Sequence, residues 1–282
     1  MNLLKITDFN EKQIADIFDL ADKLKMDSNK ILKGKTVVLF FPESSIRTRI
    51  TFEKGITDLG GTCILFPPTT LDKRELLEDV IKYIENWADA VIVRHSDYKR
   101  IEELAVHSHI PVINAMTSEN HPCEILSDIY SISRQIPNYG ALTYTFVGER
   151  GNISNSWMIV SEVLKLRLNH VCVKGNEIKP NDEYYNFTTE LNDVLNESDI
   201  ILTDPLSKEL KTETYINKYQ ITMDRMNQTK ENAILNPCPP FYRGEEVSAE
   251  VIDSEYFVGH DFKKNLLYVQ QAIILYCLGE SI

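Results

Sequence analysis

The 282-residue sequence has no long apolar run and no paired cysteines. No stretch approaches the roughly 18 apolar residues that a membrane-spanning helix needs, which excludes a protein of that kind. The first residues lack the basic and then apolar pattern of a secretory signal, so we expect a cytoplasmic protein. The five cysteines are scattered and form no C-x-x-C pair, so we expect neither a disulfide framework nor a metal site.

Positive charge is also scarce in this chain. Lys and Arg together number 30 against 42 Asp and Glu, and the net charge is −12. That balance argues against non-specific binding to nucleic acid or to an anionic membrane. An anionic substrate would therefore need a local cluster of basic residues. With 43% hydrophobic residues, the chain can bury a sizeable core without help from a metal or a disulfide.

What the chain does contain is an alternation of apolar runs with segments of helical period. The runs are typical of buried parallel strands, and we expect strands at residues 35–41, 62–66, 90–94, 111–115, 144–147, 170–173, 200–203 and 233–235. We expect helices between them at residues 47–59, 74–87, 123–135, 153–166 and 189–197, and a last apolar helix at 262–278. This rhythm predicts an α/β fold of doubly wound parallel sheets covered by helices on both faces.

The sequence Ile-Pro-Asn-Tyr-Gly at residues 136–140 interrupts a helix before a new strand begins, which predicts two domains. We expect the first domain at residues 1–137, with the C-terminal helix 262–282 packing back on it, and the second at residues 138–261. Ligands of open α/β sheets bind beyond the carboxyl ends of the strands. The motifs described below all lie at or near such ends.

A cluster of polar and basic side chains follows the first strand. Ser45, Arg47 and Thr48 lie where this strand turns into a helix, so backbone N–H groups and the positive end of the helix dipole meet there. The two hydroxyls and the planar fork of an arginine complete a set of donors that suits phosphate. The simpler alternative is a serine that caps the helix beside solvated arginines.

Four segments in succession match one known family. The segment Ser45-Ile46-Arg47-Thr48-Arg49 resembles the S-x-R-T-R signature of the aspartate and ornithine carbamoyltransferases, and the family's Phe-Glu follows it. Residues 71–75 resemble the family's mobile loop, and residues 90–95 resemble its strand that ends in an arginine that binds carbamoyl phosphate. Residues 121–124 resemble its H-P-x-Q motif. Taken singly, Lys73 could be a loop lysine, Arg94 an ion-pair partner and His121 a helix cap. Four matches in the family's order favour the resemblance.

The resemblance implies a phosphate site and an assembly. Carbamoyl phosphate would be bound by Ser45, Ile46, Arg47, Thr48, Lys73, Arg94, His121 and Glu124. Arg94 and His121 would polarise the carbonyl oxygen and act with Arg47 as the catalytic groups. Lys73 would enter the site of a neighbouring subunit, which implies a homotrimer or a multiple of trimers. The family's chemistry needs no cofactor.

Two residues of this first site depart from the family pattern. Ile46 stands where the family usually has Thr, which removes a hydroxyl but keeps the backbone N–H. Glu124 stands where the family usually has Gln, close to the carbamoyl amide. A carboxylate accepts hydrogen bonds from that amide, but it also brings negative charge towards a dianion.

In the second half, residues 145–157 form a predicted strand, turn and helix start. The turn holds Gly148 and Gly151 without a G-x-G-x-x-G, so a dinucleotide site and a nucleotide-dependent oxidoreductase are weaker alternatives. The segment looks like the ornithine-type pattern G-D-x-x-N-x-x-x-S, in which the Asn contacts the α-carboxylate of the amino acid. Asn152 is the matching position.

Asp204 follows another predicted strand, and Ser207 and Lys208 come soon after it. Ornithine-type enzymes have Asp and then Ser-Met-Gly near this point, although the spacing here is different. A carboxylate complements a cation and repels a second carboxylate, so Asp204 predicts an acceptor that carries an amine. The alternative is an Asp that only begins a turn before Pro205.

Residues 235–240, Leu-Asn-Pro-Cys-Pro-Pro, look like the family's H-C-L-P or H-P-L-P loop, with Asn236 in place of the His. In the family, backbone carbonyls of this loop hold the amine, which makes Cys238 and Pro239 candidate acceptor residues. A nucleophilic Cys238 is an alternative that lacks an evident base. The family's Asn-Arg is replaced by Asn265-Leu266, and Arg243 is a candidate to supply the missing arginine.

These observations predict transfer of the carbamoyl group of carbamoyl phosphate to an amine. Ornithine or a related diamino acid suits Asp204 and Asn152 best, and putrescine and aspartate remain open. Because Ile46, Glu124 and Asn236 depart from the family, a paralogue that binds carbamoyl phosphate without turning it over also remains open.

Overall fold

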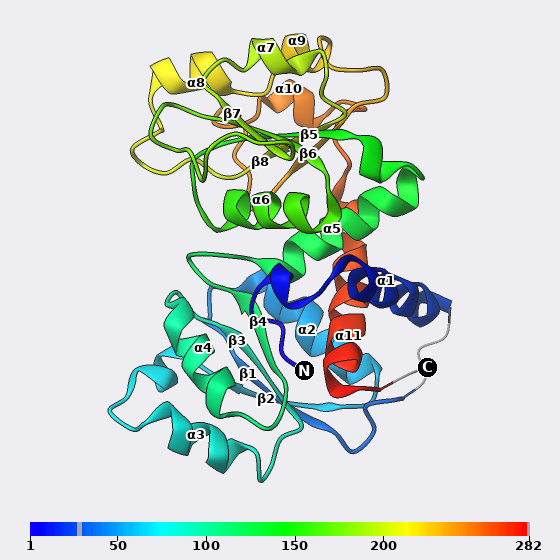
Figure 1. The fold of residues 1–282 in the computed structure, drawn as a ribbon, viewed down its shortest axis with the longest axis vertical. Helices are drawn as coiled ribbons and strands as arrows, with labels where there is room; N and C mark the ends of the chain where they lie inside the picture. The colour runs from blue at the N-terminus through cyan, green and yellow to red at the C-terminus, as the bar shows by residue number, and fades with distance from the viewer. Residues whose placement is uncertain (27–29, 281–282) are drawn as a thin grey trace. The chain divides into compact units, whose positions relative to one another are not determined.

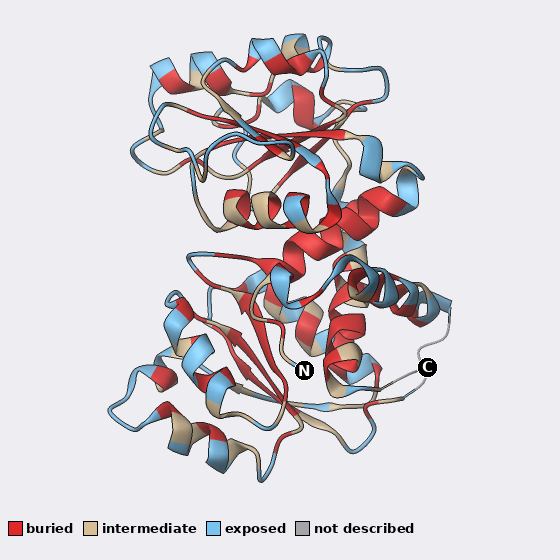
Figure 2. Cartoon of the chain, in the orientation of Figure 1, coloured by how far each residue is buried: buried red, intermediate tan, exposed pale blue. Residues whose placement is uncertain are grey.

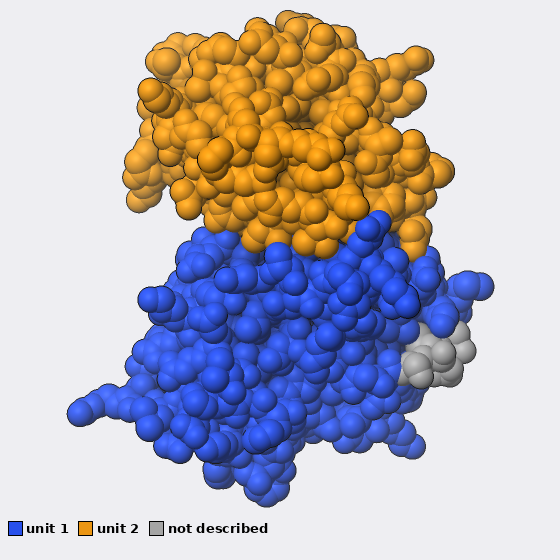
Figure 3. All heavy atoms as spheres, viewed as in Figure 1, with its two compact units in different colours: residues 1–132, 263–282 blue, residues 133–262 orange. Residues whose placement is uncertain are grey.

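The computed structural model describes residues 1–26 and 30–280, and the chain divides into two compact units. Unit 1 comprises Met1–Ile132 and Lys263–Ile282, and unit 2 comprises Ser133–Phe262 (Figure 3). Each unit is built around its own parallel β-sheet (Figure 1). The expected α/β class with two parallel sheets is therefore confirmed.

The sheet of unit 1 has the strand order β2-β1-β3-β4, and every pair is parallel. Its strands are β1 (Thr36–Phe40), β2 (Thr62–Phe66), β3 (Ala90–Arg94) and β4 (Val112–Met116). The first strand pairs with β2 on one side and with β3 on the other, so the direction of winding reverses between β1 and β3. Ligands of open α/β sheets bind beyond the carboxyl ends at such a reversal.

Helices cover both faces of this sheet, which makes unit 1 doubly wound (Figure 1). On one face α3 (Leu77–Ile84) and α4 (Tyr98–His107) contact each other and bury a cluster that includes Val38, Phe40, Val91 and Val93. On the other face α2 (Ile46–Asp58) contacts α11 (Asn265–Leu278), which in turn contacts α1 (Glu11–Met26). Strands β1, β3 and β4 and the inward sides of these helices are largely buried (Figure 2).

The C-terminal helix α11 packs back on unit 1, as predicted. The Gln271 Nε2 atom donates a hydrogen bond of 2.9 Å to the carbonyl of Gly55 on α2. A Cβ at position 55 would lie 3.0 Å from Cγ of Gln271, so the glycine permits the close approach of the two helices. The N-terminal ammonium of Met1 donates to the carbonyl of Cys277 at 3.0 Å, which ties both ends of the chain to one unit.

Strand β2 differs from the buried strand that its apolar sequence predicts. It lies at the edge of the sheet, and Ile64 and Phe66 are 39% and 40% exposed. Ile46 and Ile50 on the neighbouring helix α2 are more exposed still, at 64% and 58%. In general, an exposed apolar edge strand is prone to pair with another chain.

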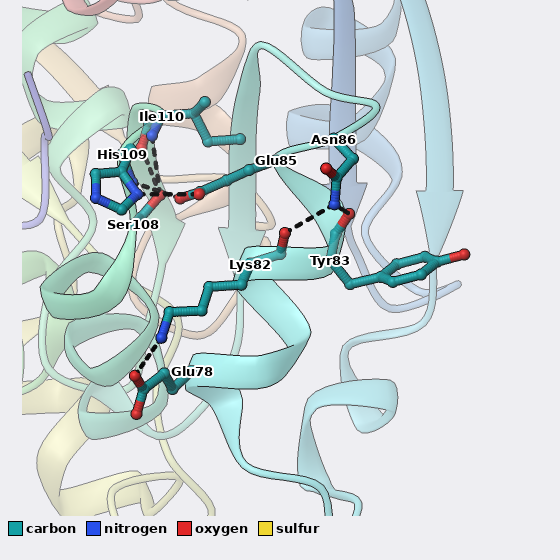
Figure 4. Close-up of polar contacts among 8 residues, drawn as sticks. All are labelled: Glu78, Lys82, Tyr83, Glu85, Asn86, Ser108, His109 and Ile110. Atoms are coloured by element: carbon teal, nitrogen blue, oxygen red, sulfur yellow. Dashed lines mark hydrogen bonds and ion pairs between the residues drawn. The ribbon is translucent and has the colours of Figure 1, made fainter.

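The C-terminal end of α3 is held by side-chain hydrogen bonds (Figure 4). The Asn86 amide donates to the carbonyls of Lys82 and Tyr83, which satisfies acceptors that the helix end leaves open. Glu85 accepts hydrogen bonds from the backbone N–H and from the ring of His109. The contacts of Glu85 with His109 join the segment before β3 to the segment before β4. The amino ends of these two adjacent strands are thereby held together.

Unit 2 has a sheet of order β7-β6-β5-β8-β9, again with parallel pairs. Its strands are β5 (Thr143–Val147), β6 (Arg167–Val171), β7 (Tyr185–Thr188), β8 (Ile200–Thr203) and β9 (Ile234–Pro237). Its helices are α6 (Asn152–Leu164), α7 (Asn192–Leu195), α8 (Glu213–Tyr219), α9 (Met223–Met226) and α10 (Ala249–Ile252). The winding reverses between β5 and β8, which predicts a ligand site at their carboxyl ends.

Helix α5 (Pro122–Gln135) follows β4, and short 3-10 helices complete the chain at Ile6–Asp8, Pro68–Asp72, Tyr139–Ala141 and His260–Lys264. Within residues 1–26 and 30–280, every helix is too short or too polar to cross a lipid bilayer.

Most predicted strands lie within two residues of the observed ones, whereas two predicted helices are too long. The helix expected at residues 74–87 spans only Leu77–Ile84, because the chain forms a 3-10 turn up to Asp72 and is extended at Lys73. The helix expected at residues 189–197 shrinks to Asn192–Leu195. The strand expected at 170–173 starts earlier, at Arg167.

Candidate active site

The first predicted site lies at the carboxyl ends of β1 and β3, where the winding of unit 1 reverses. Ser45 occupies the N-cap position of α2, but its side chain makes no capping hydrogen bond. Its buried hydroxyl instead accepts a hydrogen bond of 2.9 Å from Nη1 of Arg94, the last residue of β3. The same nitrogen lies 3.3 Å from Oγ1 of Thr48. Ser45 therefore stands at the N-cap without capping the helix through its side chain.

This arrangement gathers donors at one end of the sheet. Arg94 joins two residues that precede it by 49 and 46 positions, because pairing of β1 with β3 places their carboxyl ends side by side. A hydroxyl holds a guanidinium in place without cancelling its charge. The N-terminus of the 13-residue helix α2 adds the positive end of its dipole. Together these groups suit a small phosphorylated anion.

His121 and Glu124 are buried at the start of α5, which follows β4 in the same sheet. Burial lowers the pKa of His121 to about 4, and the charges of Arg94 and Lys263 add to the effect although Glu124 opposes it. His121 is therefore neutral near pH 7 and can donate one N–H. Burial would raise the pKa of Glu124, but Lys263, His121 and Arg47 together lower it, so this side chain is a carboxylate.

Three other residues of the predicted phosphate site are exposed. Ile46 and Arg47 lie on the first turn of α2, and Lys73 follows the 3-10 helix Pro68–Asp72. The structure thus brings Ser45, Thr48 and Arg94 together directly. Arg47 lies near enough to Glu124 to affect its pKa.

The loop that carries Lys73 is anchored beside Arg94. Nε2 of His95 lies 3.1 Å from Oδ1 of Asp72, and Nδ1 of the same ring accepts a hydrogen bond from the Asp97 N–H. A neutral ring that accepts on Nδ1 carries its hydrogen on Nε2 and donates it to Asp72. A cavity of about 290 Å³ opens next to this contact and is lined by Arg94 and His95.

In unit 2 the predicted acceptor residues lie at the carboxyl ends of three adjacent strands. Asn152 begins α6 after β5, Asp204 follows β8, and Cys238 follows β9. The Cys238 N–H donates to the carbonyl of Thr203 at 2.9 Å, which joins the last two strand ends. Pro239 extends the third segment by one residue, so the structure places these residues at one edge of the sheet, as parallel pairing predicts.

The segment with Ser207 and Lys208 is joined to the same edge by Glu149. One carboxylate oxygen of Glu149 accepts a hydrogen bond of 3.0 Å from the Ser207 N–H. Lys208 is exposed. The contact brings the turn after β5 next to the segment after β8, across the point where the winding reverses.

A buried histidine holds the turn at Gly148 through hydrogen bonds. Nε2 of His170 lies 2.9 Å from the Gly148 carbonyl, and Nδ1 lies 2.9 Å from the Tyr185 hydroxyl. Since a carbonyl only accepts, Nε2 donates and Nδ1 accepts from the tyrosine. Burial lowers the pKa of His170 to about 4, which keeps the ring neutral. The turn that leads to Asn152 is thereby held from inside the unit.

The two remaining expectations from the sequence concern Arg243 and a metal site. Arg243 forms an ion pair with Asp253 at 2.8 Å and donates to the Ala249 carbonyl, so it serves the local structure around α10. Among the side chains that the structure describes, no three His, Cys, Asp or Glu residues are grouped to hold a metal ion.

Two family models match this chain. Residues 1–134 match the family model of the aspartate/ornithine carbamoyltransferase carbamoyl-P binding domain, and residues 141–277 match that of the Asp/Orn binding domain. The chain belongs to the aspartate/ornithine carbamoyltransferase family. The resemblance of its motifs to that family is thus confirmed.

Similar members of the family are ornithine carbamoyltransferases. Those of Hydrogenovibrio crunogenus and Syntrophus aciditrophicus are 31% and 32% identical; the matches cover 99% and 97% of this chain and 99% and 98% of theirs. The ornithine carbamoyltransferase structures from Burkholderia thailandensis and Thermus thermophilus have TM-scores of 0.90 and 0.91 at 27% and 25% identity. Both matches cover 98% of each chain.

Sequence reasoning missed three residues that support the site. Lys263 contacts Glu124, Glu149 contacts Ser207, and Asp72 contacts His95. The only sequence signal was charge next to a recognised motif, and a single sequence does not show which distant charge is its partner.

Proposed function

We propose that the protein transfers the carbamoyl group of carbamoyl phosphate to the amine of ornithine or a closely related diamino acid. The products are a ureido amino acid and phosphate. The observation that supports this most is the convergence of Ser45, Thr48 and Arg94 at the reversal point of unit 1. The names of the relatives at about 30% identity over the full chain support the same reaction.

The donor is assigned to residues 1–137 with 262–282. Ser45, the Ile46 N–H, Arg47 and Thr48 bind the phosphate group, and Glu124 accepts from the carbamoyl NH2. Arg94 and His121 donate to the carbonyl oxygen as it becomes an oxyanion, and a neutral His121 supplies an N–H for this purpose. Arg47, Arg94 and His121 are the proposed catalytic residues.

The acceptor is assigned to residues 138–261. Asn152 binds the α-carboxylate of the amino acid, and Asp204 binds a cationic amine. Ser207 and Lys208 border the same edge of the sheet, and the backbone carbonyls of Cys238 and Pro239 accept from the attacking amine. These assignments rest on the placement of all three segments at the carboxyl ends of β5, β8 and β9.

The reaction needs one bond to form and one to break. The lone pair of the neutral amine forms a bond with the carbonyl carbon, and the oxyanion that results is stabilised by Arg94 and His121. The C–O bond to phosphate then breaks with its electron pair on the phosphate. The leaving phosphate takes the proton that the attacking nitrogen loses, so all atoms and charges balance.

The proposed active form is a homotrimer in the cytoplasm. Exposed apolar side chains on both sides of the β2 edge offer a surface for a second copy, and Lys73 is exposed on the loop after Leu71. All five cysteines are free thiols, which fits a reducing compartment.

The proposed reaction is tested with purified protein, carbamoyl phosphate and a panel of amines, with ureido products detected by mass spectrometry. The panel contains ornithine, lysine, 2,3-diaminopropionate, 2,4-diaminobutyrate, putrescine and aspartate. We expect product from one diamino acid. Product from aspartate or putrescine alone contradicts the assigned acceptor, and phosphate binding without any product supports a non-catalytic paralogue.

Sharing of Lys73 between subunits predicts complementation. Lys73→Ala and Arg94→Ala are each expected to be nearly inactive. In trimers formed from an equal mixture of the two, about one interface in four pairs an intact Lys73 with an intact Arg94, so activity should return to roughly a quarter of wild type. Mixed and unmixed samples are compared at equal protein concentration. A mixture no more active than its components would show that each subunit uses its own Lys73.

A further inference from the structure

A lysine that no recognised motif includes binds two buried carboxylates in unit 1. Nζ of Lys263 lies 3.1 Å from Oε1 of Glu124 and 2.6 Å from Oδ1 of Asp128. Glu124 and Asp128 are only 7% and 3% exposed and lie four residues apart on α5, so they share one face of the helix. Two like charges on one buried helix face repel each other unless a cation binds both.

Neighbouring contacts hold Lys263 in place. It lies in the 3-10 helix His260–Lys264, directly after the buried Phe262. Two residues later, the Asn265 amide donates a hydrogen bond of 2.9 Å to Oγ of Ser131 on α5. The segment is thus fixed against α5 directly after the lysine, which lowers the conformational cost of holding the ammonium at the carboxylates.

The ion cluster of Glu124, Asp128 and Lys263 reaches the donor site. His121 immediately precedes α5, and Glu124 lies three residues later in its first turn, so both lie at the same end of the helix. The charge of Arg47 acts on Glu124, and those of Arg94 and Lys263 act on His121. A phosphorylated dianion bound by Arg47 and Arg94 would therefore experience the charge of Glu124, and the ammonium of Lys263 offsets it.

We propose that Lys263 is a positioning residue of the donor site, which orients the Glu124 carboxylate towards the carbamoyl NH2 and cancels its repulsion of the phosphate. This inference rests on the proposed function. It also defines the class of donor, because a carboxylate accepts only from groups that carry N–H or O–H. Acyl phosphates with an amide NH2 are favoured, and acetyl phosphate, which ends in a methyl group, is not.

The first variant to measure is Lys263→Met. The KM for carbamoyl phosphate is expected to rise at least about tenfold, as one charge-assisted contact would give, while the KM for the amine stays within about twofold. Lys263→Arg should restore most of the affinity, since a guanidinium also binds two carboxylates. Binding of inorganic phosphate, measured by calorimetry, should weaken in parallel and needs no turnover.

The double variant Glu124→Gln/Lys263→Met separates charge balance from folding. Removal of the Glu124 charge should recover most of the phosphate affinity that Lys263→Met loses. Lys35→Met is the matched control, because Lys35 also bridges two carboxylates of unit 1, Asp89 at 3.1 Å and Glu280 at 3.8 Å, and precedes the amino end of β1. This control is expected to leave the KM for carbamoyl phosphate unchanged.

The inference is overturned if Lys263→Met binds phosphate as wild type does, or if its loss equals that of Lys35→Met. It is also overturned if the double variant binds no better than Lys263→Met. The outcomes separate it from the proposed function. A wild type that makes no ureido product while phosphate binding still depends on Lys263 contradicts the reaction and supports the charge balance. An active wild type with an unaffected Lys263→Met contradicts only the inference.

Discussion

Replacement of Arg94 by alanine is expected to lower kcat/KM for carbamoyl phosphate by about 1000-fold, the upper range for loss of one oxyanion donor. The side chain ends β3 and donates to Ser45 and Thr48, so its removal takes a charge from the site and frees two hydroxyls that it orients. In a chain of net charge −12, no general positive field replaces it. Steady-state kinetics with the preferred amine measure the effect.

Arg167→Ala is the control for loss of a guanidinium. Arg167 is exposed at the amino end of β6 in unit 2, so its loss should leave kcat/KM within about twofold, as for ordinary surface substitutions. Melting temperatures of both variants should stay close to wild type. If Arg94→Ala retains activity within a few-fold while folded, Arg94 is not the group that stabilises the oxyanion, and the proposed mechanism fails at that step.

The strands of unit 1 are predictable because they are short apolar runs between turns. The strand at residues 62–66 has its predicted bounds, but the prediction that it is buried is wrong, because this apolar sequence lies at the edge of the sheet. Periodicity does not reveal the position of a strand in the sheet. That position depends on pairing with β1, which is known only from the fold.

Strand β7 and helix α3 have weaker signals in the sequence. Strand β7, with the sequence Tyr-Asn-Phe-Thr, lies in a polar surrounding and was not expected. Its Tyr185 is nevertheless fully buried, because the hydroxyl bonds to the ring of His170, a residue of the adjacent strand. Helix α3 is shorter than predicted. The residues before Leu77 have a composition typical of helices, but they lie in an exposed loop.

Some residues of the candidate sites could be predicted from the sequence, and others could not. Ser45, Arg47 and Thr48 are contiguous, so a motif can identify them, and the meeting of Ser45 with Arg94 follows from adjacent parallel strands. The contact between Glu124 and Lys263 spans 139 residues and joins α5 to the segment before α11. No local pattern encodes such a pair. The sequence shows that Glu124 departs from the family pattern, but only the structure shows that Lys263 contacts it.

Asp204→Asn should reduce kcat/KM for the diamino acid by roughly 10- to 150-fold, the effect of losing a charge-assisted hydrogen bond to a cation. The carboxylate follows β8, whose end is held to β9 through Thr203 and Cys238, so the amide variant keeps its place and shape. A larger KM with a smaller change in kcat is expected. The measurement compares ornithine with its shorter homologues.

A matched substitution in the same unit is Asp224→Asn, which removes an exposed carboxylate from α9 and should have little effect. The decisive comparison is between acceptors. If Asp204 pairs with a cationic amine, its loss weakens diamino acids and relieves repulsion of aspartate, so the ratio of the two activities shifts towards aspartate. An equal loss with every acceptor would instead mean that Asp204 only shapes the turn before Pro205, and that another group of unit 2 selects the amine.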